Sequence, residues 1–211
     1  MSTSFPPIGQ LRRRGPGPMH RRPPRLLSVT LTELRCAATT VVLLLRRRLV
    51  LPTGEVGRRI RFGDGTKSTI FRETRLLGAT ATEPVLIVVR FRLRLLGLNR
   101  TTHALFRAES LLNTPLFAGQ PGFCSKLWLT DLATGFYRGI YEWDGADSAR
   151  RYGETLRVVL APYTQRNSFA YRVLPGQSRQ EFLAGQTPNE ASPPADRWWL
   201  PLAQSASAER I

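Results

Sequence analysis

The sequence predicts an α+β fold, and the stretch from Pro84 to Pro175 carries the observations that predict it. This stretch contains two kinds of segment in turn. In one kind, β-branched and aromatic residues alternate with period two, and in the other, apolar residues recur at helical spacing. Proline and glycine mark nearly every junction. The resulting order is strand, helix, strand, strand, helix, strand. Packed as one antiparallel sheet with two helices, this βαββαβ order is the ferredoxin-like arrangement.

The first strand is expected between Pro84 and Leu96, where aliphatic residues alternate with arginines over the second half. A helix is expected from Thr102 to Asn113, because its leucine and phenylalanine residues fall at helical spacing. It ends before Pro115, since a residue that precedes proline avoids helical geometry.

The second half of the domain begins with a predicted hairpin. Two aromatic-rich strands, Gly122 to Thr130 and Phe136 to Trp143, flank a loop in which Gly135 supplies the backbone freedom that a tight connection needs. Asp144 is placed to cap the second helix. A short strand from Ser168 to Leu174 completes the order.

An amphipathic helix and a second hairpin are expected before this domain. Thr30 and Glu33 match a capping box, so the helix should begin just before Leu31. Its uncharged part, Cys36 to Leu45, is too short to span a bilayer. A Gly-Asp-Gly turn at 63–65 then predicts a hairpin. Its two strands are Arg58 to Phe62 and Thr66 to Glu73.

Composition divides the chain into four parts. The ends are rich in proline, glycine, serine and arginine without periodicity, which is typical of disorder. Trp198 and Trp199 interrupt the carboxy-terminal tail and could dock onto the domain. The expected parts are a disordered basic arm at 1–28, the helix and hairpin at 29–83, the ferredoxin-like domain at 84–176 and a mostly disordered tail at 177–211.

The net charge of +16 is typical of proteins that bind nucleic acid or an anionic membrane surface. Arginine outnumbers lysine 29 to 2, and 13 of the arginines come before Gly63, outside the domain. RNA binding is one alternative, because the RNA-recognition fold shares the βαββαβ order and stacks bases on aromatic residues of its third strand. An open sheet face would then let Arg90, Arg92 and Arg94 hold phosphates.

Peripheral membrane association is a further alternative, with residues 31–51 as the binding segment. Packing of this helix on the domain is the competing arrangement. In the membrane arrangement the arginines that follow would meet anionic headgroups. The residues against lipid would be Val41, Val42, Leu44, Leu45 and Leu49.

Metal and cofactor chemistry are not expected. His103 is the only histidine in the domain, so histidine ligands for a metal cannot gather there. Cys36 and Cys124 follow no metal or redox spacing, and we expect reduced, buried thiols in a cytoplasmic protein.

Two segments of the hairpin carry a family resemblance. They comprise Pro121, Gly122, Phe123, Ser125, Lys126, Leu127, Trp128 and Leu129, followed by Gly135, Tyr137, Arg138, Gly139, Tyr141, Glu142 and Trp143. On these residues the core from Pro84 to Gly176 resembles the dimeric α/β-barrel superfamily, in particular its antibiotic-biosynthesis-monooxygenase-like branch and related small uncharacterised proteins.

The resemblance implies a homodimer with sheets face to face and a pocket between each sheet and its helices. Some members oxidise aromatic polyketides with dioxygen and neither metal nor flavin, whereas others bind haem or only hold a ligand. The second helix here has no histidine, which argues against haem. The expected function is therefore binding of a small hydrophobic or aromatic molecule, with monooxygenase-like oxidation as the enzymatic form and non-catalytic binding or interaction as the alternative.

Candidate pocket residues can stabilise an electron-rich substrate anion in a dry cavity. They are Asn113, Trp128, Tyr137, Arg138, Tyr141 and Trp143. The competing interpretation is that the aromatic residues pack a core or a dimer interface. In that interpretation, Arg138 and Lys126 form salt bridges at the rim with Glu142 or Glu154.

Overall fold

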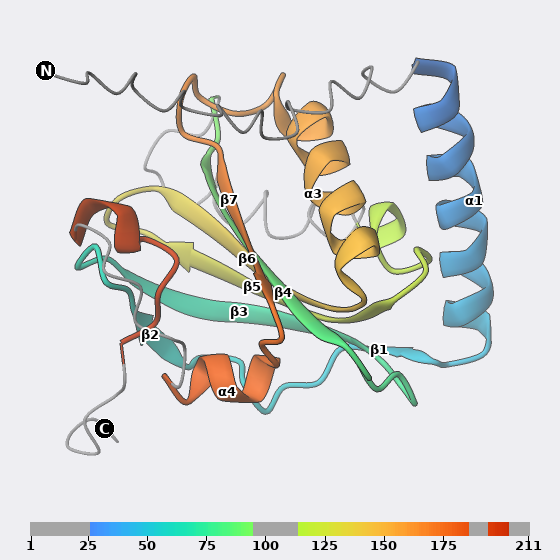
Figure 1. Cartoon of the computed structure of the whole chain (residues 1–211), viewed down its shortest axis with the longest axis horizontal. Helices are drawn as coiled ribbons and strands as arrows, with labels where there is room; N and C mark the ends of the chain where they lie inside the picture. The colour runs from blue at the N-terminus through green and yellow to red at the C-terminus, as the bar shows by residue number, and fades with distance from the viewer. Residues whose placement is uncertain (1–25, 95–113, 186–193, 203–211) are drawn as a thin grey trace, which may run out of the picture.

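The computed structural model describes residues 26–94, 114–185 and 194–202. Figure 1 shows one curved sheet between helices on both of its sides. The helices are α1 (Leu26–Leu45), α3 (Ala146–Leu160) and α4 (Arg179–Leu183), with short 3-10 turns η1 (Thr114–Leu116) and η2 (Pro194–Arg197). The strands are β1 (Leu49–Val50), β2 (Arg59–Arg61), β3 (Lys67–Leu76), β4 (Pro84–Arg92), β5 (Phe123–Asp131), β6 (Phe136–Asp144) and β7 (Ala170–Pro175).

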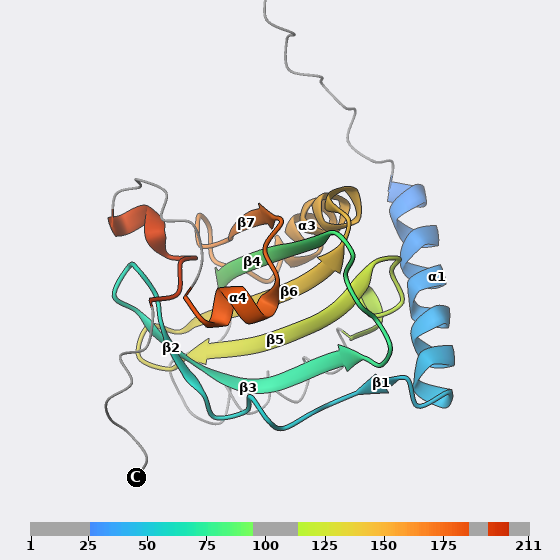
Figure 2. The same cartoon turned by 60° about the horizontal axis from the view of Figure 1, so that its bottom comes forward.

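All seven strands pair antiparallel in the order β1-β3-β5-β6-β4-β7, with β2 also on β3. Figure 2 shows β3, β5, β6, β4 and β7 lying side by side in this order. Four neighbouring strands of this sheet, in the order β5-β6-β4-β7, form the ferredoxin-like arrangement. The predicted fold class is therefore confirmed. Strand β3, the long second strand of the predicted amino-terminal hairpin, pairs with β5 and extends the sheet at that edge.

The predicted strands of the domain agree with β4 to β7 within a few residues at each end. The amino-terminal hairpin forms as β2 and β3 around the expected turn. The predicted helix from Thr102 to Asn113 and the arm from Met1 to Pro24 lie outside the described residues. Cys36 and Cys124 are buried, and neither forms a disulfide.

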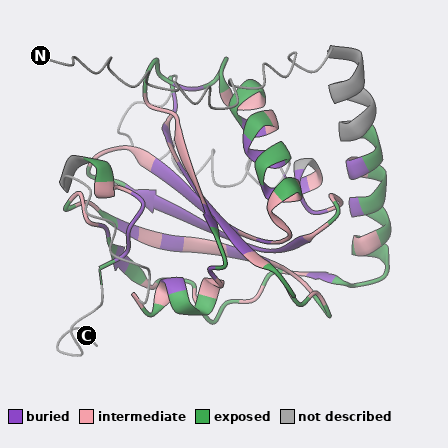
Figure 3. Cartoon of the chain, viewed as in Figure 1, coloured by how far each residue is buried: buried purple, intermediate pink, exposed green. Residues whose placement is uncertain are grey.

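Each face of the sheet has its own core, because the strand side chains alternate between two covered sides. Helix α3 covers one face with Ala149, Tyr152 and Leu156, together with Phe117 after η1. Figure 3 shows the buried residues running through the centre of the sheet, while the helices carry exposed residues on their outer sides. On the opposite face lie side chains of β2, of α4 and of residues 198–200.

Helix α4 was not predicted, since its sequence falls in the tail that was expected to be mostly disordered. A capping box starts it: the Ser178 hydroxyl accepts from the Glu181 N–H, and the Glu181 carboxylate accepts from the Ser178 N–H. Phe182 and Trp199 are then almost fully buried against the sheet. The chain's own residues thus cover this face of the sheet, and the predicted homodimer stays a prediction.

Two boundary predictions need correction. Asp144 does not cap α3, because Gly145 occupies the N-cap position with a positive φ of 86°. The Asp144 carboxylate instead accepts hydrogen bonds from the N–H groups of Thr82 and Glu83 at 2.9 and 2.8 Å, which fixes the chain before β4. Helix α1 starts at Leu26 rather than near Leu31, since nothing in the leucine-rich first turn interrupts helical geometry.

Candidate functional site

A small cavity lies between the sheet and α3, and aromatic side chains dominate its wall. Its volume is about 30 Å³. Half-buried Phe71 and Leu160 lie at its edge, on β3 and at the end of α3. The lining residues are Phe71, Phe91, Lys126, Trp128, Leu129, Tyr137, Arg138, Gly139, Tyr141, Tyr152, Leu156 and Leu160.

Lys126 is the exceptional member of this lining, because a charged side chain is rarely buried without an acidic partner. Side chains alternate between the two faces of β5, so Lys126 and Trp128 both point toward α3. Lys126 is only 3% exposed. Its Nζ lies 2.9 Å from the centre of the Trp128 ring, 4.3 Å from that of Phe117 and 4.5 Å from that of Tyr141. The amine therefore sits in a cage of three aromatic rings.

Burial lowers the pKa of Lys126 well below its ordinary value, and the positive charge of Arg72 lowers it further. No carboxylate among the described residues forms a salt bridge with Lys126. Burial consequently shifts the equilibrium of this side chain toward the neutral amine. A neutral buried lysine amine is both a proton acceptor and a nucleophile.

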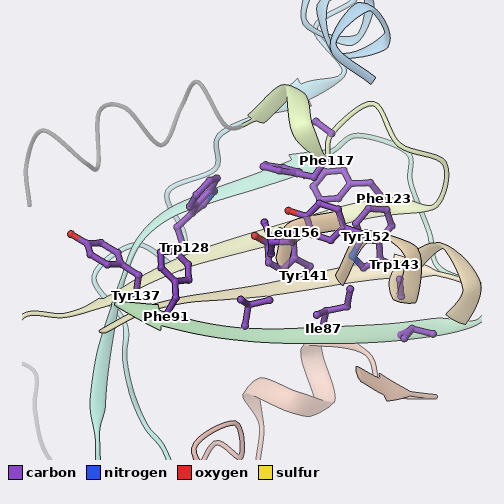
Figure 4. Close-up of a cluster of buried hydrophobic side chains, with 14 of the residues drawn as sticks. Ile87, Phe91, Phe117, Phe123, Trp128, Tyr137, Tyr141, Trp143, Tyr152 and Leu156 are labelled. Atoms are coloured by element: carbon purple, nitrogen blue, oxygen red, sulfur yellow. The ribbon is translucent and has the colours of Figure 1, made fainter. Parts of the chain in front are cut away.

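Tyr141 and Tyr152 are two of the three tyrosines that line the cavity. Their side chains are hydrogen-bonded to each other, and their ring centres are 5.0 Å apart. Burial raises the pKa of Tyr141, although the hydrogen bond from Tyr152 works in the opposite direction. The Tyr141 phenol therefore stays protonated, and its hydroxyl can donate to an anion. Figure 4 shows Tyr141, Tyr152 and Phe117 gathered at one part of the cluster, with Tyr137 and Phe91 further along the sheet.

The structure brings together only part of the predicted set. Trp128, Tyr137 and Tyr141 line the cavity, as the alternation of β5 and β6 indicates. Trp143 lies deeper in the core, where its ring centre is 5.7 Å from that of Phe123. Asn113 lies outside the described residues.

Arg138 lines the cavity, but its guanidinium group lies on the opposite face of the sheet. It donates to the hydroxyl groups of Ser68 at 2.7 Å and Thr66 at 2.5 Å, and it lies 3.4 Å from the Asp64 carboxylate. Arg90 donates to the same carboxylate at 2.9 Å. These contacts tie the β2–β3 turn to the sheet.

The predicted rim salt bridges to Glu142 or Glu154 do not form for Lys126 or Arg138. The reason is that β5 and β6 are inner strands, so neither side chain reaches a solvent-exposed rim. The arginines proposed to hold phosphates do not share an open sheet face either. Arg90 lies 4.9 Å from the Trp198 ring centre, and Arg92 lies 4.0 Å from that of Phe136.

Sequence reasoning assigned no pocket role to Lys126 or Tyr152. The available signal for Lys126 was its place two residues before Trp128 in a strand that is otherwise almost free of charge. Every residue of β5 is buried, so a lysine inside it cannot escape to water. For Tyr152 the signal was the apolar face of α3, shared with Ala149 and Leu156.

Gly139 sets the position of the Tyr141 ring. A Cβ atom at Gly139 would come 2.6 Å from the Cε2 atom of Tyr141, closer than real contacts allow. We expect Gly139→Ala to lower the free energy of unfolding by about 1–3 kcal/mol, the cost of overpacking a well-packed site. Urea unfolding measures this loss. Gly54→Ala is the matched control, because no atom lies within 4 Å of its added Cβ, and equal losses in both variants would contradict the assignment.

No family model and no curated protein sequence matches the chain. Solved structures that are similar to the chain include the following three. An uncharacterised ferredoxin-fold protein related to antibiotic biosynthesis monooxygenases, from Listeria monocytogenes, has a TM-score of 0.38 and 13% identity over 54% of this chain and 66% of its own. A monooxygenase-like protein from Listeria innocua has a TM-score of 0.35 and 13% identity over 52% of this chain and 63% of its own.

The third is a major regulator of staphylococcal pathogenesis, with a TM-score of 0.39 and 9% identity over 66% of this chain and 92% of its own. The chain thus spans slightly less than two thirds of each Listeria protein. Likeness at this level of identity concerns the fold alone.

Proposed function

We propose that the chain binds a small electron-rich aromatic molecule against Lys126 and oxidises it with dioxygen. The observation that carries the proposal is the buried Lys126 amine inside its aromatic cage. An apolar wall suits an aromatic ring, and a few convergent polar groups fix its orientation. The family resemblance adds a cofactor-free monooxygenase as the type of enzyme. Within the described residues no group of three or more histidine, cysteine or acidic side chains gathers as a metal site.

The reaction needs a base that removes a proton from the substrate and groups that stabilise the ions formed by this transfer. The neutral Lys126 amine takes the proton of a phenol or enol, so an O–H bond breaks and an N–H bond forms. The ammonium ion is then stabilised by the Trp128, Phe117 and Tyr141 rings. The Tyr141 hydroxyl, which accepts a hydrogen bond from Tyr152, donates its own proton toward the substrate oxyanion.

The substrate anion is electron-rich and can reduce dioxygen without a cofactor. At an activated methylene group one oxygen atom enters as a carbonyl and the other leaves as water, with both methylene hydrogens ending in that water. The substrate supplies all the electrons, so no separate reductant is required. Since a water needs about 10–15 Å³, the present cavity holds roughly two waters. Phe71 and Leu160 must therefore move outward when an aromatic ring enters.

Oxygen uptake with a panel of hydroxylated naphthalenes and anthrones tests this function. We expect Trp128→Phe and Tyr141→Phe to lower the rate on the order of ten-fold or more while the unfolding midpoint changes little. Leu132→Ala is the control, since that side chain is exposed on the β5–β6 loop. Equal rates in all variants would remove Trp128 and Tyr141 from the site. Saturable binding without oxygen uptake would favour the non-catalytic ligand-binding alternative.

A further inference from the structure

Helix α1 lies at the edge of the molecule, beside the sheet rather than over it. Figures 1 and 2 agree on this position. The helix contacts η1 and β1. Its inward side is defined by Cys36 and Thr40, which are 3% and 0% exposed, and Gly119 allows the close approach of the helix backbone at Cys36. One face of α1 is therefore anchored, and the remainder is available.

The outward face of α1 is a stripe of aliphatic side chains. Leu34, Val41 and Leu45 recur at positions i, i+7 and i+11, which fall on one side of a helix. They are 67%, 53% and 79% exposed, and Val42 and Leu44 flank them at 43% and 52%. In Figure 3 the part of this helix that is coloured by burial is mostly in the colour of exposed residues. An apolar stripe of this size on a helix surface indicates an interaction site.

A basic cluster continues the stripe. Arg46, Arg47 and Arg48 follow Leu45 directly, and all three are exposed. No described carboxylate forms a salt bridge with them. The described side chains of α1, from Leu34 to Leu45, also include no acidic residue. The surface thus combines aliphatic area with positive charge at one end.

We propose that this face of α1 docks on an anionic phospholipid surface. The aliphatic stripe would lie at the boundary of headgroups and acyl chains, about 5–10 Å deep. Each arginine near a negatively charged leaflet adds electrostatic attraction to the membrane surface. No helix in the described ranges is long and apolar enough to cross a membrane, which fits a helix that lies in the interface.

Charge distinguishes lipid from a second copy of the chain as the occupant. Two α1 stripes packed together would bring two positively charged segments together, because residues 26–48 carry four arginines against Glu33 alone. An anionic surface provides the opposite charge. The structure also corrects the predicted lipid-facing set, since Leu49 is 9% exposed and belongs to the core against α3. Leu34 takes its place.

Co-sedimentation of the full chain with vesicles tests the proposal. The vesicles are phosphatidylcholine with and without phosphatidylglycerol. We expect retention only with phosphatidylglycerol, and a loss of at least ~10-fold in affinity for Leu34→Glu/Leu45→Glu, since insertion depends on buried apolar area. Val158→Glu is the matched control, because Val158 is 52% exposed on α3. Arg46→Gln/Arg47→Gln should weaken retention and reduce its sensitivity to salt.

Three outcomes would overturn the proposal. Unchanged retention of the Leu34→Glu/Leu45→Glu variant would mean that other basic segments bind the vesicles. Absence of retention of the unaltered chain on either vesicle would exclude lipid as the occupant. Light scattering could also show a dimer that the same double substitution converts to a monomer. If vesicle retention were then unchanged, the stripe would be the interface with a second copy of the chain. Circular dichroism confirms in each case that the variants are folded.

Discussion

Replacing Lys126 with methionine is expected to slow oxygen uptake strongly and to stabilise the folded chain at the same time. Methionine is close in length to lysine and apolar, so it fills the space among the Trp128, Phe117 and Tyr141 rings without an amine. Loss of the base should lower the rate by about 10²–10⁴-fold, the usual contribution of a positioned proton acceptor. A residue that packs only for stability would not show this combination.

The stability gain follows from burial. Lys126 is 3% exposed and has no described acidic partner, so folding must remove an amine from water without the compensation of an ion pair. We expect the free energy of unfolding at neutral pH to rise by about 1–3 kcal/mol in Lys126→Met. Urea unfolding measures it. Lys67→Met, at the chain's only other lysine and on the exposed end of β3, should leave both rate and stability unchanged.

The pH dependence gives an independent check. The pKa of Lys126 in the folded chain is lowered, whereas in the unfolded chain it is near 10.4. Between these two values the unfolded chain binds more protons, so this group makes stability rise with pH. The gain in Lys126→Met should therefore be constant below the folded pKa and shrink as pH rises through the window. Above about pH 10.4 only the smaller cost of burying the neutral amine remains. A variant that is less stable than the unaltered chain at pH 7 would assign Lys126 a structural role.

The sequence could predict the fold because its signals are local. Alternation over Phe136 to Trp143 placed Tyr137 and Tyr141 on one face, and a Gly-Asp-Gly turn placed the first hairpin. Lys126 was misjudged because its environment depends on which strands flank β5. The addition of β3 to the edge of the sheet makes β5 an inner strand, and the packing of η1 then closes the cage around the amine.

Arg138 and Asp64 show the same limit. They are 74 residues apart, and no spacing rule joins a turn residue to an inner strand. Helix α4 was missed for another reason, since a five-residue helix in a polar segment has little periodicity to detect. Its capping box, by contrast, was visible at Ser178 and Glu181. The sequence predicts most of the helices and strands and the apolar face of each. Contacts between residues on different strands can be predicted only when the order of the strands in the sheet is known.

The pairing of Asp64 with Arg138 predicts an asymmetric loss of stability. The Arg138 side chain is fully buried, and burial lowers its pKa to about 10 despite the opposing effect of Asp64. Asp64→Asn leaves Arg138 and Arg90 facing each other without a carboxylate, and it keeps one side-chain oxygen for the Thr66 N–H. We expect this change to cost about 3–5 kcal/mol, the range for an uncompensated buried charge.

Arg138→Met should cost less, about 1–2 kcal/mol for the lost hydrogen bonds to Ser68 and Thr66, because Asp64 retains its 2.9 Å contact with Arg90. The double variant should be less destabilised than the sum of the two, by about 0.5–3 kcal/mol. Asp147→Asn is the control, since Asp147 is 88% exposed and lies 3.8 Å from Arg150; its effect should stay within about 0.5 kcal/mol. Equal losses for Asp64→Asn and Arg138→Met would contradict this prediction. They would show that water reaches the Arg138 guanidinium, because a hydrated arginine loses little stability when its carboxylate partner is removed.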